Sequence, residues 1–429
     1  MDYLSILLYT YLALLCAIII VILCNSYYFK YIYVYFKKDI KIEKSDKLNK
    51  YVVLIPARNE SKVIRNILNS LKNQTYNKDM FDVYVITQDE NDPTNKIVGE
   101  YGYHYFLRTN LKNRARKGYA LQECYEYLVQ NNIQFDSVVI FDADNILSPE
   151  YLTELNNLKN MGYQVGVGLR ESSNANTNFI SATSALLFTF QSTFINKCRS
   201  IIYKKIMISG TGYFMDKQVI DDAGGWIWVG LTEDVQLTRY CYRNGVKMGY
   251  NPNATYYDEQ PTDLKTLHNQ HVRWVWGFMG RDMLDLGVNK KPKYKKTPLL
   301  GRWEFFFSIN LFQLSEWCVV FHMLTIIVFI IYFLVIGAYQ NIAIYAPFIL
   351  VDIILMFFIC SVACFIEMLF SGKNFKVSRK LKIMSVLFGF IFWTDWLLAW
   401  LDGFFNSKKR KTWVSIEHKG GNNNIKTNK

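Results

Sequence analysis

Three short groups of polar residues could do chemistry in this chain of 429 residues. The first is Asp142-Ala143-Asp144, directly after the apolar run 137–141. Side chains alternate along a strand, so the two aspartates should point the same way. Their charges repel unless a divalent cation neutralises them, and oxygen ligands suit Mg²⁺ or Mn²⁺, which also bind nucleotide diphosphates. Asp142 and Asp144 are therefore candidate metal ligands; the alternative is a solvated turn with a helix cap before Pro149.

The second group is Glu233-Asp234, at the start of a helical pattern over 235–244 that Gly245 ends. Carboxylates in the first turn of a helix ordinarily complement the helix dipole, a contribution of about 0.3–1 kcal/mol. A carboxylate can also act as a general base, which contributes typically about 10²- to 10⁴-fold to a rate. The pattern alone leaves both interpretations open.

The third group is Gln270, Arg273 and Trp274, which stand at i, i+3 and i+4 and so share one face of a helix. An arginine offers a bidentate fork for phosphate oxygens, and a tryptophan offers a flat surface on which a sugar can stack. The alternative is an amphipathic helix whose aromatic residues anchor it at a membrane, since Trp276 and Phe278 follow.

In this order, and between apolar tracts, the three motifs resemble those of the membrane-embedded family-2 glycosyltransferases, which include the cellulose, chitin, hyaluronan and poly-N-acetylglucosamine synthases. The resemblance covers residues 50–280 in detail. It implies transfer with inversion, in which a cation holds the departing diphosphate. Asp234 would then take the proton of the acceptor hydroxyl, with Glu233 in support. Gln270, Arg273 and Trp274 would line the site where the diphosphate and the acceptor meet.

The resemblance also implies further substrate-binding residues, each of which could equally be a turn residue. Those expected near the nucleotide or the acceptor sugar are Glu60, Asp89, Asp92, Lys117, Asp142, Gly210, Thr211 and Gly212. At the nucleotide end Gln88 takes a place that is often acidic in the family.

Alternating apolar runs and amphipathic stretches place these motifs in an α/β domain with a mainly parallel sheet. We expect strands over 51–55, 82–87 and 137–141, with helices over 60–74 and 119–129. Ligands of such sheets bind at the carboxyl ends of the strands, where the loops 56–60, 88–94 and 142–145 should converge. The resemblance implies the Rossmann-like GT-A version of this fold. No Gly-x-Gly-x-x-Gly follows the first strand, which disfavours a dehydrogenase.

The composition, 51% hydrophobic and 16% aromatic, predicts membrane spans. The uncharged tract 3–24 is long enough to cross, and we favour an uncleaved anchor over a signal peptide. Lysines crowd its C-terminal side, which places the following domain in the cytoplasm. Further apolar tracts lie at 317–336, 342–370 and 383–405. The stretch 178–197 is predicted to be an amphipathic helix, either under the membrane or packed against the domain; the alternative is an ordinary core helix.

The expected organisation is an N-terminal transmembrane helix over 1–25, a basic juxtamembrane segment over 26–49, a GT-A domain over 50–280, a basic linker and interfacial helix over 281–316, transmembrane or interfacial helices over 317–405 and a basic tail over 406–429. Three C-terminal crossings would put that tail outside, against the positive-inside rule. Either 303–314 joins an extra crossing, or one tract lies in the interface. We favour 383–405 for the interface, because Asp395 and Asp402 are costly in hydrocarbon.

The expected protein is a multi-pass cell-membrane enzyme, a processive β-glycosyltransferase that uses UDP-N-acetylglucosamine or UDP-glucose with Mg²⁺ or Mn²⁺ to elongate an extracellular polysaccharide. The alternative adds one sugar to a lipid acceptor. A silent nucleotide-sugar sensor or transport subunit is a third, remote hypothesis. The net charge of +13 gathers beside membrane tracts, which favours contact with membrane lipids over nucleic acid. An accessory membrane or export subunit would fit a polysaccharide synthase.

Overall fold

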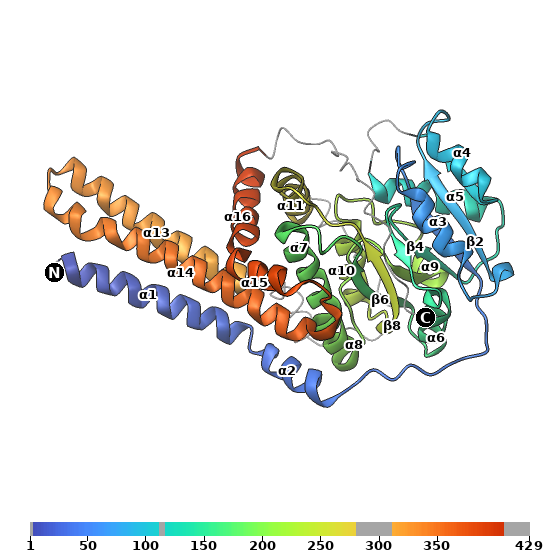
Figure 1. Ribbon diagram of the computed structural model, residues 1–429, viewed down its shortest axis with the longest axis horizontal. Coiled ribbons are helices and arrows are strands. Elements are labelled where there is room, and N and C mark those ends of the chain that lie inside the picture. The colour runs from blue at the N-terminus through green and yellow to red at the C-terminus, as the bar shows by residue number, and fades with distance from the viewer. Residues whose placement is uncertain (1–2, 111–115, 280–310, 407–429) are drawn as a thin grey trace.

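The chain forms a mixed α/β domain from which a sheaf of long helices extends (Figure 1). The computed structural model describes residues 3–110, 116–279 and 311–406. The predicted linker and interfacial helix over 281–316 lies outside these residues except for its last six, and the predicted tail lies outside them from residue 407.

The sheet has eight strands within the described residues, in the order β3-β2-β1-β4-β7-β6-β8-β5. Strands β1 to β4 run parallel, and β6 is parallel to β8, whereas β7 runs antiparallel to β4 and β6, and β5 to β8. This confirms the predicted mainly parallel α/β sheet and adds antiparallel pairings. The strands are β1 (Tyr51–Pro56), β2 (Phe81–Thr87), β3 (His104–Leu107), β4 (Ser137–Ile140), β5 (Ile146–Leu147), β6 (Val165–Ser172), β7 (Tyr213–Asp216) and β8 (Met248–Asp258).

Helices cover both faces of the sheet, because alternate residues of each central strand enter different cores. In β1, Val53 and Ile55 pack with one set of helices, while Val52 and Leu54 pack with the other. The first set is α3 (Ile64–Lys72), α4 (Pro93–Glu100) and α6 (Tyr151–Asn160). The second set is α5 (Lys117–Gln130), α9 (Lys217–Ala223) and α10 (Glu233–Asn244).

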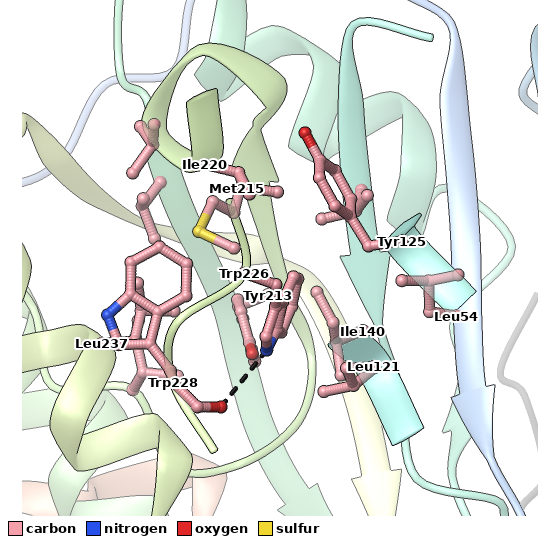
Figure 2. Packing of buried hydrophobic residues seen from close by; sticks show 14 of the residues in the cluster. Leu54, Leu121, Tyr125, Ile140, Tyr213, Met215, Ile220, Trp226, Trp228 and Leu237 are labelled. Carbon is pink, nitrogen blue, oxygen red and sulfur yellow. Dashed lines mark hydrogen bonds between the residues drawn. The ribbon is translucent and has the colours of Figure 1, made fainter. Parts of the chain in front are cut away.

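Two buried tryptophans, Trp226 and Trp228, lie in the second core (Figure 2). The indole N–H of Trp226 donates to the carbonyl of Trp228 at 3.2 Å, and their rings meet edge to face. The backbone of Trp228 lies so close to α5 that a Cβ on Gly118 would stand 2.4 Å from its carbonyl oxygen. Glycine is therefore required at that position, and this packing fixes the start of α5, which carries Lys117.

The stretch 178–197 is a core helix rather than a surface one. It comprises α7 (Phe179–Phe190) and a π-helix over Gln191–Asn196, and it continues into α8 (Lys197–Tyr203). Helix α7 packs against β6 on one side and against the C-terminal helices α14 (Tyr339–Ser371) and α15 (Arg379–Leu387) on the other. The π-helix joins these layers, since Phe194 contacts both Phe370 of α14 and Tyr28 of α2 (Tyr27–Lys37).

Three described helices are long and apolar enough to cross a membrane: α1 (Tyr3–Cys24), α13 (Leu311–Val335) and α14. They extend together from the domain in Figure 1. Inside this bundle Asp352 is fully buried, and it accepts bonds from the hydroxyl of Tyr11 at 3.1 Å and from Nδ1 of His322 at 2.8 Å. The buried charge therefore ties α14 to α1 and α13.

The tract predicted over 383–405 is not one straight helix. Helix α15 is followed, after a break at Phe388, by α16 (Gly389–Asn406), and the two are bent by 46°. Helix α16 packs against α11 (Leu264–Met279) of the α/β domain, beside which it stands in Figure 1. The placement of this tract in the membrane interface, rather than across the membrane, stays a prediction.

Candidate active site

A cavity of about 390 Å³ opens at the carboxyl ends of β1, β2 and β4, where the predicted loops converge. The predicted site residues that line it are Glu60, Lys117, Asp142, Asp144, Gly210, Glu233, Asp234, Gln270, Arg273 and Trp274. Asp89, Asp92, Thr211 and Gly212 do not line it. The fold thus brings together residues that lie up to 214 positions apart in the sequence, from Glu60 to Trp274.

Lys117 holds the acidic residues together. Its Nζ lies 2.5 Å from Oδ1 of Asp142 and 3.9 Å from Oε1 of Glu233, and it donates to the carbonyl of Gly210 at 2.8 Å. Burial works against the charged form of Asp142, but Lys117 outweighs it and holds the pKa of Asp142 below its usual value. Burial likewise disfavours a charged Lys117, yet Asp142 and Glu233 raise its pKa above the usual value. The pair is therefore charged.

Glu233 and Asp234 open α10, as predicted, and both are held inside the site. Burial raises the pKa of Glu233 to about 7, against the opposing charge of Lys117. Burial also raises the pKa of Asp234, although its Oδ1 accepts the backbone N–H of Val235 at 2.8 Å. A carboxylate with a raised pKa is a stronger proton acceptor once ionised, which suits Asp234 to the work of a base.

Asp142 and Asp144 do not stand on a strand end as expected. Strand β4 ends at Ile140, and the two aspartates lie in the turn before β5. Oδ1 of Asp144 accepts the side-chain N–H of Asn145 at 3.1 Å, and its Oδ2 accepts the backbone N–H of Glu259 at 3.2 Å. Both aspartates still line the cavity. The turn therefore places the two carboxylates at one site, as strand alternation was expected to do.

The donor set fits a cation that arrives with a nucleotide. Among the described residues no three His, Cys, Asp or Glu side chains converge as a metal site. Mg²⁺ typically needs only one or two carboxylates, with substrate phosphates and waters as its other ligands. Asp142 and Asp144 on the cavity wall can supply that pair.

The segment 210–212 forms the wall behind these groups. Thr211 is fully buried; its hydroxyl accepts the backbone N–H of Asp142 at 2.9 Å and donates to Asn145. Gly212 has φ +66°, and a Cβ there would stand 2.3 Å from the ring of Tyr256. Gly210 lies at the cavity, where a Cβ would be 3.8 Å from Oδ2 of Asp234. Gly210 alone of the three therefore leaves room beside the proposed base.

Helix α11 presents Gln270, Arg273 and Trp274 to the cavity, which agrees with the predicted single face. A Cβ at Gly277 would stand 2.2 Å from Cγ2 of Thr232, so α11 lies directly on the residue before Glu233. Within the described structure, Oε1 of Gln270 and Nε of Arg273 are buried without a hydrogen-bond partner. Polar atoms of this kind are available to a ligand.

The end of the cavity at which the sequence predicts the nucleotide includes Glu60 and Gln88, which follow β1 and β2. Asp92 caps α4 by accepting the backbone N–H of Thr94 at 2.8 Å, and it also accepts that of Asn59 at 2.8 Å. Asp89 accepts the backbone N–H of Asn91 at 2.9 Å. Asp89 and Asp92 thus make the contacts of turn residues, the alternative that the sequence left open. Nucleotide binding by these two residues stays a prediction.

Arg170 is a cavity residue that the motifs did not indicate. Its guanidinium pairs with the buried Asp258, donates to the carbonyl of Ser209 at 2.9 Å and lies 3.5 Å from the ring of Phe188. It thereby connects β6 and β8 to the segment before Gly210. A charged residue near the carboxyl end of an apolar strand could have pointed to it.

Comparison with known proteins agrees with this geometry. The model of the family described as "Glycosyltransferase like family 2" matches residues 49–277, more than half of the chain. The chain belongs to glycosyltransferase family 2. The protein is therefore an enzyme, and the sensor or transport hypothesis is not supported.

Two of its curated relatives have different acceptors in their names. The chain is 25% identical over 254 residues to the beta-monoglucosyldiacylglycerol synthase of Trichormus variabilis, covering 57% of this chain and 53% of the relative. It is 23% identical over 279 residues to the poly-beta-1,6-N-acetyl-D-glucosamine synthase of Staphylococcus aureus, covering 62% and 65%. A probable glycosyltransferase of Bacillus subtilis, YdaM, is 28% identical over 285 residues, covering 63% and 64%. The matches span less than two thirds of these relatives.

A solved structure shares the fold over almost the whole chain. The mannosyltransferase PcManGT from Pyrobaculum calidifontis, in complex with GDP-Man and Mn²⁺, superposes with a TM-score of 0.61 at 12% identity. The superposition covers 94% of this chain and 99% of that one. This likeness confirms the GT-A fold.

In this family-2 enzyme the cavity extends beyond Arg273 to the apolar helices outside the sheet. There it is lined by Tyr28 of α2, Gln191 of the π-helix, Glu367 of α14, and Trp393 and Trp396 of α16. Nε2 of Gln191 and the indole nitrogens of both tryptophans are buried without a hydrogen-bond partner in the described structure. This end is thus aromatic with a few polar atoms, a composition that suits an amphiphilic ligand.

Proposed function

We propose that the enzyme transfers a sugar with inversion from a UDP-sugar, UDP-N-acetylglucosamine or UDP-glucose, to an acceptor hydroxyl. The observation that carries this proposal is the single cavity that holds Asp234, Lys117 and Arg273 together with Asp142 and Asp144. A base, cationic partners for a diphosphate and a carboxylate pair for a divalent cation are the groups that such a transfer needs.

Asp234 takes the proton from the acceptor hydroxyl while the oxygen of that hydroxyl forms a bond to the anomeric carbon of the donor sugar. The bond from that carbon to the diphosphate breaks on the opposite side, and the electron pair leaves with UDP. Asp142 and Asp144 would hold Mg²⁺ or Mn²⁺, which supplies neutralisation of the diphosphate charge. Arg273 faces the same charge with a buried, unpartnered Nε in the described structure. It strengthens its contact as the diphosphate departs.

The leading proposal for the acceptor is the end of a growing polysaccharide, which the enzyme elongates processively. The membrane end of the cavity supports an acceptor that lies against α14 and α16, and Trp274 offers its terminal sugar an aromatic surface. An accessory membrane or export subunit would carry the product onward.

The same observation supports a second candidate, in which one sugar is added to a lipid. An acceptor that belongs to the bilayer would reach Asp234 between α2, α14 and α16, along Tyr28, Glu367 and Trp393. The similarity to a beta-monoglucosyldiacylglycerol synthase is compatible with this candidate.

For its location, we propose a multi-pass cell-membrane protein with a cytoplasmic catalytic domain in contact with membrane lipids. The three apolar helices and the lysines of segment 26–49 support this orientation. A cysteine placed at the exposed Gln340 should be labelled from outside intact cells, and one at Lys44 should not.

The direct test is to give the purified full-length enzyme, in detergent or lipid, a panel of radiolabelled UDP-sugars with Mn²⁺ and to size the products. A long polymer supports the leading proposal, whereas a monoglycosylated lipid supports the second. An enzyme that transfers from no UDP-sugar, but does from another nucleotide sugar, would overturn the assignment of the donor.

A further inference from the structure

A buried carboxylate lies next to the active site, on α16, between Trp393 and Trp396, which line the cavity, although it does not line the cavity itself. Asp395 of α16 bonds Nδ1 of His268 at 2.8 Å through one oxygen and Nδ1 of His271 at 2.6 Å through the other. The side chain of Asp395 is 12% exposed and that of His271 is fully buried. One aspartate therefore forms hydrogen bonds with α11 at two positions.

Aromatic packing holds the same contact in place. The ring of His271 stacks on Trp396 at a centroid distance of 4.5 Å and meets Phe392 edge to face at 4.9 Å. Burial lowers the pKa of His271, while the charge of Asp395 opposes that effect and His268 adds to it. A neutral His271 that donates its Nδ1–H to the carboxylate fits these surroundings.

His271, which Asp395 binds, and Arg273, which lines the cavity, lie on different sides of the same helix. Successive residues of an α-helix turn by about 100°, so His271 and Arg273 are about 200° apart around α11. Arg273 lines the cavity, and Asp395 does not. Helix α11 is thus held between α16 on one side and, through Gly277, Thr232 at the start of α10 on the other.

A merely space-filling contact would not need a charge here. A carboxylate within an apolar helix is costly, and apolar residues of similar size often replace buried ion pairs without loss of stability. Two hydrogen bonds from positions i and i+3 do what apolar contacts cannot: they are directional, and they fix the rotation of α11 about its own axis.

We propose that Asp395 is a positioning residue for sugar transfer, which sets the place of Arg273 relative to Asp234 through its bonds to His268 and His271. The inference rests on the proposed function of those two residues. A displacement of about 1 Å at a reacting group can cost about 10²-fold in rate. Loss of Asp395 should therefore affect turnover more than donor binding.

The test is the Asp395→Ala variant of the full-length enzyme, assayed with the preferred UDP-sugar. We expect kcat to fall about 30-fold, with the Kd of UDP within about threefold of wild type. Asp395→Asn keeps the size and can accept from only one histidine N–H, so its kcat should be intermediate; it carries the test if the alanine variant does not fold.

The matched control is Asp352→Asn. Asp352 is also a buried aspartate bonded to a histidine, but its hydrogen bonds connect α14 to α1 and α13, and none is to α11. This variant should lower the melting temperature and leave kcat within about twofold of wild type, since Asp352 does not line the cavity and lies 15 residues before Glu367, the residue of α14 that does. A general weakening of the helices would instead lower kcat equally in both variants and would overturn the inference.

A double-mutant cycle with Arg273→Ala tests whether Asp395 affects kcat through the position of Arg273. If Asp395 acts by presenting Arg273, then Asp395→Ala should cost less than about threefold in that background. A full 30-fold loss there, or wild-type kcat in Asp395→Ala alone, would overturn the inference while the proposed function stands. A wild-type enzyme that transfers from no UDP-sugar would overturn both.

Discussion

The two ends of the cavity are built from different parts of the chain. At the nucleotide end, charged and polar side chains such as Glu60 and Lys117 stand on loops and helix starts that follow the parallel strands. At the membrane end, Trp393, Trp396 and Glu367 come from helices beyond residues 49–277, the part that the family model matches. We infer that the chemistry of transfer belongs to the family domain, whereas the choice of acceptor depends on the helices attached to it.

The largest effect should follow from Asp234→Asn, which tests the junction between the two ends. Transfer should fall by about 10²- to 10⁴-fold, because the amide cannot take the acceptor proton. The affinity for UDP should stay within about twofold, since the base contacts the acceptor rather than the nucleotide. Transfer assays and calorimetric titration with UDP measure the two quantities. Turnover near that of wild type would exclude Asp234 as the base.

A change at the nucleotide end should alter donor binding instead. Asp144→Ala removes a candidate cation ligand, so the affinity for UDP in the presence of Mn²⁺ should fall by at least about tenfold. Without a divalent cation, wild type and variant should bind UDP alike. Equal affinity of wild type with and without Mn²⁺ would show that no such cation site operates.

Trp274 belongs to the family domain but adjoins the membrane end, where its ring lies 5.6 Å from that of Trp396. Trp274→Ala should change the length of the product more than the binding of the donor. Loss of the aromatic surface should weaken the hold on the terminal sugar by about 1 kcal/mol, roughly fivefold in affinity. Release then competes with the next addition, so a processive enzyme should yield shorter polymer. Sizing of radiolabelled product on a gel measures this. Arg273→Ala is the comparison variant, in which each addition should be slower and polymer scarcer because less charge stabilises the departing diphosphate.

The smallest effect concerns Glu233 and pH. Burial raises its pKa to about 7, well above its ordinary value, so the folded protein favours the protonated form. Stability from this group is therefore present at low pH and is lost as pH rises toward and through 7, by at most about 1.4 kcal/mol per pH unit. Glu233→Gln should raise the melting temperature at pH 8 and change it little at pH 4. An equal change at both would contradict the raised pKa.

The sequence predicted the first half of the sheet well because the signals there are local. The strands expected over 51–55, 82–87 and 137–141 occur at Tyr51–Pro56, Phe81–Thr87 and Ser137–Ile140. Alternating burial and short parallel crossovers leave a clear pattern within a few tens of residues. The antiparallel β7, which enters the sheet between β4 and β6, has no such signal, because its neighbours come from distant parts of the chain.

Site residues could be predicted from the sequence where they belong to a short motif. They could not be predicted where contacts between distant parts of the chain place them. Gln270, Arg273 and Trp274 lie on one face because their spacing requires it. Arg170 was not predicted, since its partner Asp258 lies 88 residues away.

Asp395 shows the same limit in the apolar helix α16. Taken alone it is a costly charge in an apolar tract, but the structure supplies two histidines 124 and 127 residues away in the chain. Spacing within one helix can be read from a sequence; partners across the fold cannot.

The most direct test of the central claim is the stereochemistry of the bond that the enzyme forms. The donors UDP-N-acetylglucosamine and UDP-glucose carry their sugar in the α configuration, and a single displacement assisted by Asp234 inverts it. Proton NMR of the isolated product should therefore show a β-anomeric signal, whether the acceptor is a polysaccharide or a lipid. An α-linked product would contradict the account, because retention requires a mechanism in which Asp234 is not the base of a single displacement.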